Sequence, residues 1–316
     1  MSCQYIRARS LDDALSILAG LGDRAAVLAG GTDLILGMRA GQLAPECLVD
    51  ISRLEELRGI RFANGSPESG LIVGAATTVH ELASSPLLAG GYRLLAEAAG
   101  TLASVQIRNR ATVGGNLCHA APSADCAPPL LALEAQVELA GPQGRERVPL
   151  EDFFVGPGQT VLGAGRILVG LYLPYPGDCS GGCYIKHSLR RAMDCAFVGV
   201  AALVCVDGER LSRARIGLGA VASTPIRARR AEALLTERGD FGPETFAAAA
   251  RVAAGEARPI DDIRASAWYR RRMVEVQTRR ALERAASEAK YPERGTSEAK
   301  YSERGTRATS WAGPLS

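Results

Sequence analysis

Two glycine pairs, each beside a threonine, constrain the fold of this chain most. The first stands in "VLAGGTDLILGMRAG", residues 27–41, and the second in "ATVGGN", residues 111–116. A glycine pair leaves backbone N–H groups open to close approach because no Cβ is present, and such groups can hold phosphate oxygens. One pair alone is equally typical of a tight turn. Two such loops together predict a cradle that holds the two phosphates of a dinucleotide from two sides.

Other phosphate-binding motifs fit this chain less well. No Gly-Lys-Ser or Gly-Lys-Thr sequence of a nucleotide-hydrolase phosphate loop occurs. Gly217, Gly219 and Ala222 satisfy the Gly-x-Gly-x-x-Ala pattern of nicotinamide-dinucleotide binding. Thr224 and Pro225 follow at once, so the helix that this motif requires cannot start there. We therefore expect a strand followed by a turn.

Length and composition predict an ordinary globular protein. Its 316 residues suffice for about two domains, and the hydrophobic share of 47% argues against wholesale disorder. The net charge of +3, with scattered Lys and Arg, gives no sign of a nucleic-acid partner. Neither a signal peptide nor an apolar run long enough to span a membrane is visible, so we expect a cytoplasmic chain.

The eight cysteines and three histidines do not form a metal-binding pattern. The cysteines are spread through the chain without a CxxC pair, and no HExxH sequence occurs. We therefore expect reduced thiols and no metal site. Cys118, His119 and Cys126 lie near one another in sequence, but an iron–sulfur cluster needs four thiolates, so we interpret them as structural.

Hydrophobic periodicity predicts two lobes in the first half of the chain. Residues 11–21 have helical spacing, and the apolar runs 25–30 and 47–52 are typical of buried strands, which together make a small β-α-β unit. Residues 60–62 and 71–78 flank a turn-rich stretch and predict a hairpin that opens a second lobe. The second lobe is expected to continue with a helical stretch at 81–104 and strands at 135–141 and 166–174.

A third section should follow the Pro- and Gly-rich stretch at 173–182. Strands at 197–206 and 213–222, and helices between 231 and 286, make it α+β. We expect the segment 261–285 to close this domain as one helix. Its predicted apolar stripe consists of Ile263, Trp268, Val276 and Leu282.

The end of the chain differs from the rest. Residues 287–296 are repeated almost unchanged as 297–306, and both copies are polar and charged. Such a composition cannot form a core, so we expect 287–316 to be a solvated, disordered tail. A docking arm for a partner is the alternative.

Three stretches, in this order and spacing, resemble the FAD-binding medium subunit of the molybdenum hydroxylases. That family includes xanthine dehydrogenase, carbon monoxide dehydrogenase and 4-hydroxybenzoyl-CoA reductase. The stretches are "VLAGGTDLILGMRAG", "RNRATVGGNLCHAAPSADCAPPLLALEA" and "YIKHSLRRAMDCAFVGVAA". The likeness covers about residues 3–286, which is everything before the repeated tail.

The resemblance implies an α+β fold. Residues 1–57 and 58–175 would be the two lobes of an FAD-binding domain of the vanillyl-alcohol-oxidase (PCMH) type. Residues 176–286 would be an α+β C-terminal domain like that of the carbon monoxide dehydrogenase flavoprotein. The reductase branch carries an extra iron–sulfur cluster in an insertion after the second glycine loop, and this chain lacks the insertion.

The resemblance also implies which residues hold FAD. The backbone of the first loop would wrap the pyrophosphate, with the second loop facing it. Asp125 would hold the ribose or adenosine side with help from Ser123, Lys186 would lie near the flavin, and Thr78 would border the cofactor. The implied FAD-binding residues are Ala29, Gly30, Gly31, Thr32, Asp33, Leu34, Thr78, Thr112, Gly114, Gly115, Asn116, Ser123, Asp125 and Lys186.

The chemistry of flavins is consistent with a lysine in that place. A reduced flavin develops negative charge at N1 and the C2 oxygen, and a nearby ammonium stabilises it and raises its potential. Without the resemblance, Lys186 would be interpreted as a surface lysine. Arg190 and Asp194 are interpreted as an ordinary ion pair. His187 is expected to be an interior histidine, with a flavin-side proton donor as the alternative.

The implied function is electron transfer. In the family, a large molybdopterin subunit hydroxylates the substrate and a small subunit with two [2Fe–2S] clusters relays electrons to FAD. FAD then passes them to NAD⁺, a quinone, oxygen or another acceptor. We expect a heterotrimer or a dimer of heterotrimers, and no catalytic acid or base on this chain. The alternatives are a stand-alone FAD-dependent oxidase or reductase, and a scaffold that has lost FAD.

Overall fold

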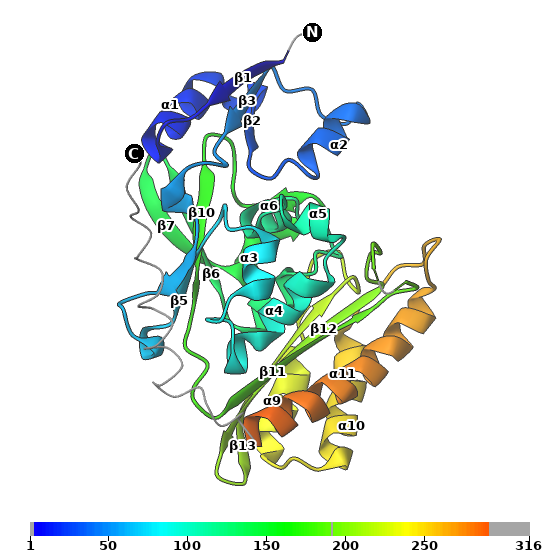
Figure 1. Cartoon of the computed structure of the whole chain (residues 1–316). Helices are drawn as coiled ribbons and strands as arrows, with labels where there is room; N and C mark the ends of the chain where they lie inside the picture. The colour runs from blue at the N-terminus through cyan, green and yellow to red at the C-terminus, as the bar shows by residue number, and fades with distance from the viewer. Residues whose placement is uncertain (1–2, 191, 291–316) are drawn as a thin grey trace, which may run out of the picture.

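Short apolar runs separated by turns build three main sheets in this chain (Figure 1). The structure is a computed structural model that describes residues 3–190 and 192–290. In these residues, no helix combines the length and the apolar character needed to cross a bilayer. Helices and strands both contribute to every part of the fold, so the chain is α+β as predicted.

The first sheet is parallel and small. Its strands are β1 (Gln4–Arg7), β3 (Cys47–Asp50) and β2 (Ala25–Leu28), in that order. Helix α1 (Leu11–Leu21) connects β1 with β2, and the Ser10 side chain caps it by accepting a hydrogen bond from the Asp13 N–H at 3.1 Å. The predicted β-α-β unit is confirmed, and β1 is an additional strand that the periodicity did not reveal.

The second sheet is antiparallel and covered by helices on one face (Figure 1). The predicted hairpin is present as its first two strands, and the predicted strands 135–141 and 166–174 correspond to its β6 and β10. Its strand order is β4 (Ile60–Phe62), β5 (Leu71–Gly74), β10 (Ile167–Leu173), β6 (Gln136–Gly141) and β7 (Gly144–Pro149). The associated helices are α3 (Val79–Ser84), α4 (Arg93–Thr101), α5 (Val105–Arg108), α6 (Val113–Cys118), α7 (Ala127–Ala132) and α8 (Leu150–Phe153).

Two apolar clusters hold this sheet between its neighbours. Leu71, Val137 and Leu171 pack beneath the helices in the largest core. Ile167 and Val169 of β10 belong instead to the core of the first sheet and its helix α1. A two-stranded ribbon of β8 (Phe154–Gly156) and β9 (Gln159–Thr160) completes this part of the chain.

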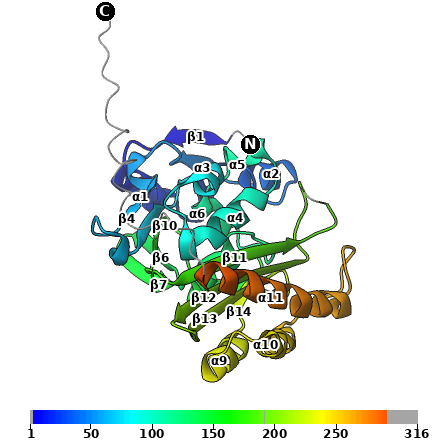
Figure 2. The same cartoon turned by 60° about the horizontal axis from the view of Figure 1, so that its bottom comes forward.

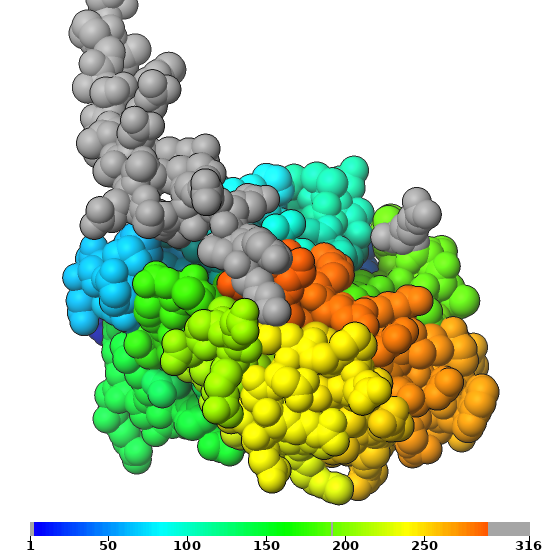
Figure 3. Space-filling model, turned by 90° about the horizontal axis from the view of Figure 1, so that it is seen from below, coloured from blue at the N-terminus to red at the C-terminus, as the bar shows by residue number. Residues whose placement is uncertain are grey.

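The third sheet lies between two helical layers (Figures 1 and 2). Its antiparallel order is β11 (Ser180–His187), β12 (Val198–Asp207), β13 (Arg210–Gly219) and β14 (Ile226–Arg227). Helices α4 and α7 pack on it from the second lobe. The other layer consists of α9 (Arg229–Arg238), α10 (Pro243–Glu256) and α11 (Ala267–Lys290), and Figure 3 shows this layer from below, in yellow and orange.

The predicted apolar stripe of α11 is wrong in part. The helix begins at Ala267, so Ile263 lies outside it and is fully exposed, and Trp268 is 72% exposed. Its buried face instead consists of Arg270, Val274, Gln277, Thr278, Ala281, Leu282, Ala285, Ala286 and Ala289. The Asp262 carboxylate accepts hydrogen bonds from the N–H groups of Arg264 and Ala265, and this turn delays the start of the helix.

The C-terminal end of α11 also differs from the prediction. The helix continues to Lys290, past the expected domain limit at residue 286. The last turns of α11 can lie directly on β11 because Gly181 has no side chain there. A Cβ at Gly181 would lie 2.1 Å from the Ala285 carbonyl oxygen. The rest of the predicted tail, residues 291–316, lies outside the described residues.

The Gly-x-Gly-x-x-Ala pattern serves packing between the second lobe and the third sheet. Gly217 and Gly219 lie within β13, and the next helix along the chain, α9, begins only at Arg229. A Cβ at Gly217 would lie 2.0 Å from the Pro128 carbonyl oxygen, and one at Gly219 would lie 2.7 Å from Pro128 Cγ. The expectation of a strand followed by a turn is therefore confirmed, and the glycines are required because α7 lies against them.

This contact predicts a difference between two glycine-to-alanine substitutions. Gly217→Ala forces α7 away from β13 and should lower the free energy of unfolding by about 1–3 kcal/mol. Gly255→Ala is the matched control, because Gly255 lies in α10 with no atom near its absent Cβ, and it should stabilise by about 0.5–1 kcal/mol. Urea unfolding midpoints measure both, and equal midpoints would contradict the packing role.

Candidate functional site

The first glycine loop presents a row of unpaired backbone donors. Strand β2 ends at Leu28, and the chain turns through Gly31, at a φ of +75°, into helix α2 (Leu34–Arg39). In the described part of the chain, none of the N–H groups of residues 30–34 donates a hydrogen bond. The carbonyl groups of Gly31 and Asp33 are used, since they accept from Ile35 and Gly37. The loop can therefore donate several hydrogen bonds to an anionic ligand.

The second glycine loop is built differently, because the N–H groups of residues 113–116 already donate within the chain. The Gly114 N–H donates to the Ala75 carbonyl at 2.9 Å, and a Cβ at Gly114 would lie 2.8 Å from Ala75 Cβ. The Thr112 hydroxyl caps α6 by accepting from the Gly115 N–H at 3.1 Å. The side-chain oxygen of Asn116 is the exception, since it is buried without a hydrogen-bond partner in the described part. The side-chain oxygen of Asn116, a hydrogen-bond acceptor, is thus a group that this loop leaves open.

The two loops and Thr78 lie together as one group, which we call the two-loop cluster (residues 29–34, 78 and 112–116). A Cβ at Gly30 would lie 2.1 Å from the Arg110 carbonyl oxygen, so the first loop packs directly on the start of the second. Thr78 pairs with Thr112 in an isolated antiparallel bridge. Nε2 of His119, at the end of α6, lies 4.0 Å from Oδ1 of Asp33.

Thr78 has a structural task in this cluster. Its hydroxyl accepts from the Glu81 N–H at 3.1 Å, and the Glu81 carboxylate accepts from the Thr78 N–H at 2.7 Å. This capping box begins α3. Glu81 was not among the predicted residues, although the Thr-x-x-Glu spacing could have revealed the cap.

Asp125 forms the centre of a second, buried group, the Asp125 cluster (Thr101, Asp125, Tyr184 and Lys186). Nζ of Lys186 lies 2.7 Å from one carboxylate oxygen, and the Tyr184 hydroxyl donates to the other at 2.9 Å. The side chains of Lys186 and Asp125 are only 7% and 8% exposed. Burial raises the pKa of Asp125, and the charge and hydrogen bonds of Lys186 and Tyr184 partly offset this.

Lys186 is therefore not a surface lysine. Its ammonium group also donates to the Thr101 carbonyl at 3.3 Å, so two of its three donors are used. Tyr184 and Thr101 were not predicted, although Tyr184 precedes Lys186 by two residues and therefore shares its face of β11. Ser123 is half-buried. In the described residues, no hydrogen bond or ion pair connects the Asp125 cluster directly with the two-loop cluster.

The segment after Lys186 contains His187, which was expected to be an interior histidine, and Arg190 and Asp194, which were expected to form an ordinary ion pair. Nε2 of His187 lies 3.0 Å from the Tyr269 hydroxyl, and the ring contacts Phe197 edge-on at 5.2 Å between centroids. Burial, and then the charge of Arg280, lower the pKa of His187. The Asp194 carboxylate accepts from the Arg190 N–H at 2.9 Å and lies 3.7 Å from its guanidinium. These contacts match the interior histidine and the ordinary ion pair.

Burial also explains the cysteines near this site. It raises the pKa of the Cys118 and Cys126 thiols to about 12, so both are protonated and unreactive. Across residues 3–190 and 192–290, no three His, Cys, Asp or Glu side chains gather as a metal site would require.

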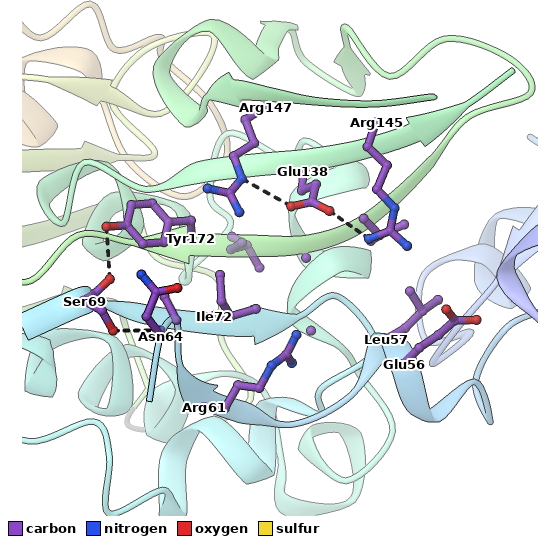
Figure 4. A pocket seen from close by; sticks show the side chains of 15 residues that line it. Glu56, Leu57, Arg61, Asn64, Ser69, Ile72, Glu138, Arg145, Arg147 and Tyr172 are labelled. Carbon is purple, nitrogen blue, oxygen red and sulfur yellow. Dashed lines mark hydrogen bonds and ion pairs between the residues drawn. The ribbon is translucent and has the colours of Figure 1, made fainter. Parts of the chain in front are cut away.

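A groove of about 390 Å³ lies apart from both clusters, across the open face of the second sheet (Figure 4). Arg145 and Arg147 both pair with Glu138, at 2.9 and 3.2 Å. The Arg147 guanidinium lies 5.3 Å from the centre of the Tyr172 ring. Cross-strand charge pairs of this kind are typical of a protected sheet edge, and none of the predicted site residues lines the groove.

Comparison with known families divides the chain in two. Residues 1–176 match the FAD binding domain in molybdopterin dehydrogenase. Residues 183–285 match the CO dehydrogenase flavoprotein C-terminal domain.

Individual relatives cover nearly the whole chain. It is 35% identical over 286 residues to the putative xanthine dehydrogenase FAD-binding subunit of Escherichia coli (strain K12), covering 90% of this chain and 96% of that one. It is 36% identical over 282 residues to the carbon monoxide dehydrogenase medium chain of Hydrogenophaga pseudoflava, with coverages of 89% and 96%. A solved structure of carbon monoxide dehydrogenase from Hydrogenophaga pseudoflava superposes with a TM-score of 0.86 and 36% identity, covering 91% and 98%.

The buried ion pair predicts a large loss of stability when one partner is removed. Lys186→Met leaves the Asp125 carboxylate without its cation, and Asp125→Asn leaves the ammonium without its anion. Each should lower the free energy of unfolding by about 3–5 kcal/mol. The matched control is Arg24→Met, because the Arg24–Glu46 pair is exposed and should contribute less than about 1 kcal/mol. Chemical denaturation measures all three, and a cost for Lys186→Met as small as the control's would refute the buried pair.

The His187 contacts predict a dependence of stability on pH. Because its folded pKa lies below the ordinary value of 6.5, the unfolded chain binds the proton more tightly. Stability from this residue is therefore present above pH 6.5 and is lost as the pH falls through the folded pKa. Unfolding midpoints of the wild type should decline more steeply over this range than those of His187→Gln. Parallel declines would show that His187 does not titrate differently in the folded state.

Proposed function

Because this chain belongs to the family of FAD-binding medium subunits of the molybdenum hydroxylases, we propose that it is the electron-transfer subunit of such a complex. FAD on this chain receives electrons from [2Fe–2S] clusters of a small subunit. It then passes them to NAD⁺, a quinone, oxygen or another acceptor. A large molybdopterin subunit carries out the substrate chemistry, and the chains form a heterotrimer or a dimer of heterotrimers.

The row of unpaired N–H groups at residues 30–34 supports this proposal most strongly. These donors surround the start of α2, where the partial charges of the backbone favour an anion. We assign the FAD pyrophosphate to them. The unpaired side-chain oxygen of Asn116 lies in the loop that packs against them, and it can accept a hydrogen bond from a hydroxyl or N–H group of the cofactor.

We also place the Asp125 cluster in the FAD site, at its flavin end. Because Lys186 binds Asp125 directly, the separate places implied for them, at the flavin and at the adenosine side, cannot both hold. The Lys186 ammonium group holds Asp125 and the Thr101 carbonyl, which leaves one donor for the cofactor. Lys186 thus positions Asp125 and keeps positive charge in a buried place, where it stabilises negative charge on a ligand. When bound, FAD supplies the electron-accepting and electron-releasing chemistry.

The names of the relatives favour a subunit over a stand-alone enzyme. They include a FAD-binding subunit, a medium chain and a dehydrogenase complex subunit. Native purification tests this preference. We expect the chain to be yellow and to bring a two-cluster iron–sulfur chain and a molybdopterin chain with it. A chain that purifies alone and turns over a substrate by itself would contradict the subunit proposal.

The first loop predicts a specific loss of FAD affinity. Gly31→Val places a β-branched residue at a φ of +75°, with its Cβ 2.9 Å from the Leu28 side chain. The strain of about 1–2 kcal/mol should weaken FAD binding about tenfold or more. Gly163→Val is the matched control, because Gly163 also has a positive φ of +68°, has no atom within 4 Å of its absent Cβ, and belongs to neither cluster. Fluorescence titration of the apoprotein with FAD measures the affinity of both variants. Equal affinities would contradict the assignment of the pyrophosphate to this loop.

A further inference from the structure

Five large apolar side chains are exposed on two segments that meet beside the proposed FAD site. Leu189 and Met193 lie in the loop between β11 and β12, and Ile260, Ile263 and Trp268 lie in the segment that enters α11. Leu189 is 78% exposed and Ile263 is fully exposed. We call these five residues the apolar rim. Exposed groups of this size, with a tryptophan among them, are typical of protein–protein interfaces.

The two segments are joined by a direct contact. His187 ends β11, and its Nε2 lies 3.0 Å from the hydroxyl of Tyr269 in the first turn of α11. Leu189 lies two residues after His187, and Trp268 lies one residue before Tyr269, so this contact connects the two segments. Figures 1 and 2 both show the loop after β11 next to the segment before α11.

The apolar rim also borders the Asp125 cluster. The Met193 N–H donates to the Ala103 carbonyl at 3.4 Å, and the nearby Thr101 carbonyl accepts from Lys186. Leu189 follows Lys186 by three residues. A protein bound to the rim would therefore lie close to the flavin end of the proposed site.

The backbone of the rim is held in place before any partner binds. Asp262 accepts from the Arg264 and Ala265 N–H groups and lies 2.6 Å from the buried guanidinium of Arg270. Partial burial raises the pKa of Asp262, but these hydrogen bonds outweigh it and lower the pKa to about 2. The turn therefore stays intact at neutral pH and holds Ile263 outward. An ordered surface of this kind costs little conformational entropy on binding.

We propose that the apolar rim is the docking surface for the partner chain that delivers electrons to FAD. This inference rests on the proposed function, in which that chain is the small iron–sulfur subunit. An electron donor must approach the flavin closely, and the rim is an exposed apolar surface that adjoins Lys186. Arg271 in the first turns of α11 is exposed and has no ion pair in the described part, so an acidic border on the partner would complement it.

Co-purification of the co-expressed subunits tests the proposal. With the affinity tag on this chain, Ile263→Glu combined with Trp268→Ser should reduce the recovered small subunit at least tenfold, while FAD stays bound. Leu189→Glu tests the other segment independently. Val155→Glu is the matched control, because Val155 is 63% exposed on β8, outside both segments, and it should leave the complex intact.

The outcomes separate this inference from the proposed function. Wild-type recovery of the small subunit by both rim variants would overturn the docking surface and leave the proposed function standing. Loss of FAD from folded rim variants would show that the rim contacts the cofactor, which also overturns it. If the wild-type chain brings no iron–sulfur subunit at all, the proposed function itself fails. Circular dichroism confirms that each variant is folded.

Discussion

Gly30 lies against the carbonyl oxygen of Arg110, and the geometry of the proposed site depends on this close approach. A Cβ at Gly30 would lie 2.1 Å from that oxygen, so only glycine lets the first sheet's loop meet the second lobe here. The Val79 N–H donates to the neighbouring Ala111 carbonyl at 2.8 Å, which fixes the same stretch from the other side. Ile167 and Val169 of β10 pack into the core of the first lobe and so also hold the first sheet against the second lobe. The unpaired N–H groups of the first loop and the unpaired side-chain oxygen of Asn116 are thereby held in one place.

The glycine pairs led to the proposed site but not to the reason why each glycine is there. We predicted from the sequence that both pairs leave room for phosphates. The structure shows that Gly30 and Gly114 make room for other backbone atoms of the same chain, and that Thr112 and Thr78 cap helices. The first loop keeps the N–H groups of residues 30–34 free, whereas those of residues 113–116 donate within the chain. A glycine pair in the sequence indicates that there is no room for a Cβ at these positions, but it cannot show which neighbouring atoms take up that room.

Contacts between distant residues explain what the sequence could not reveal. Asp125 and Lys186 are 61 residues apart, and only the resemblance to a known family suggested that both belong to one site. Similarly, Glu134 binds Arg227 of β14 from 93 residues away at 3.0 Å, which joins the segment after α7 to the third sheet. Arg227 also pairs with the buried Glu232 of α9. Helical periodicity found α11 but misplaced its start, because the Asp262 turn is local and polar. The domain limits at 57, 175 and 286 stay predictions.

Amide hydrogen exchange of residues 28–36, measured with and without FAD, tests the assignment of the pyrophosphate most directly. The N–H groups of residues 30–34 have no partner in the described chain, so we expect FAD to slow their exchange strongly. The N–H groups of Val113 and Gly114 already donate within the chain and should change much less. Unchanged exchange in residues 28–36, with protection by bound FAD appearing elsewhere, would contradict the assignment.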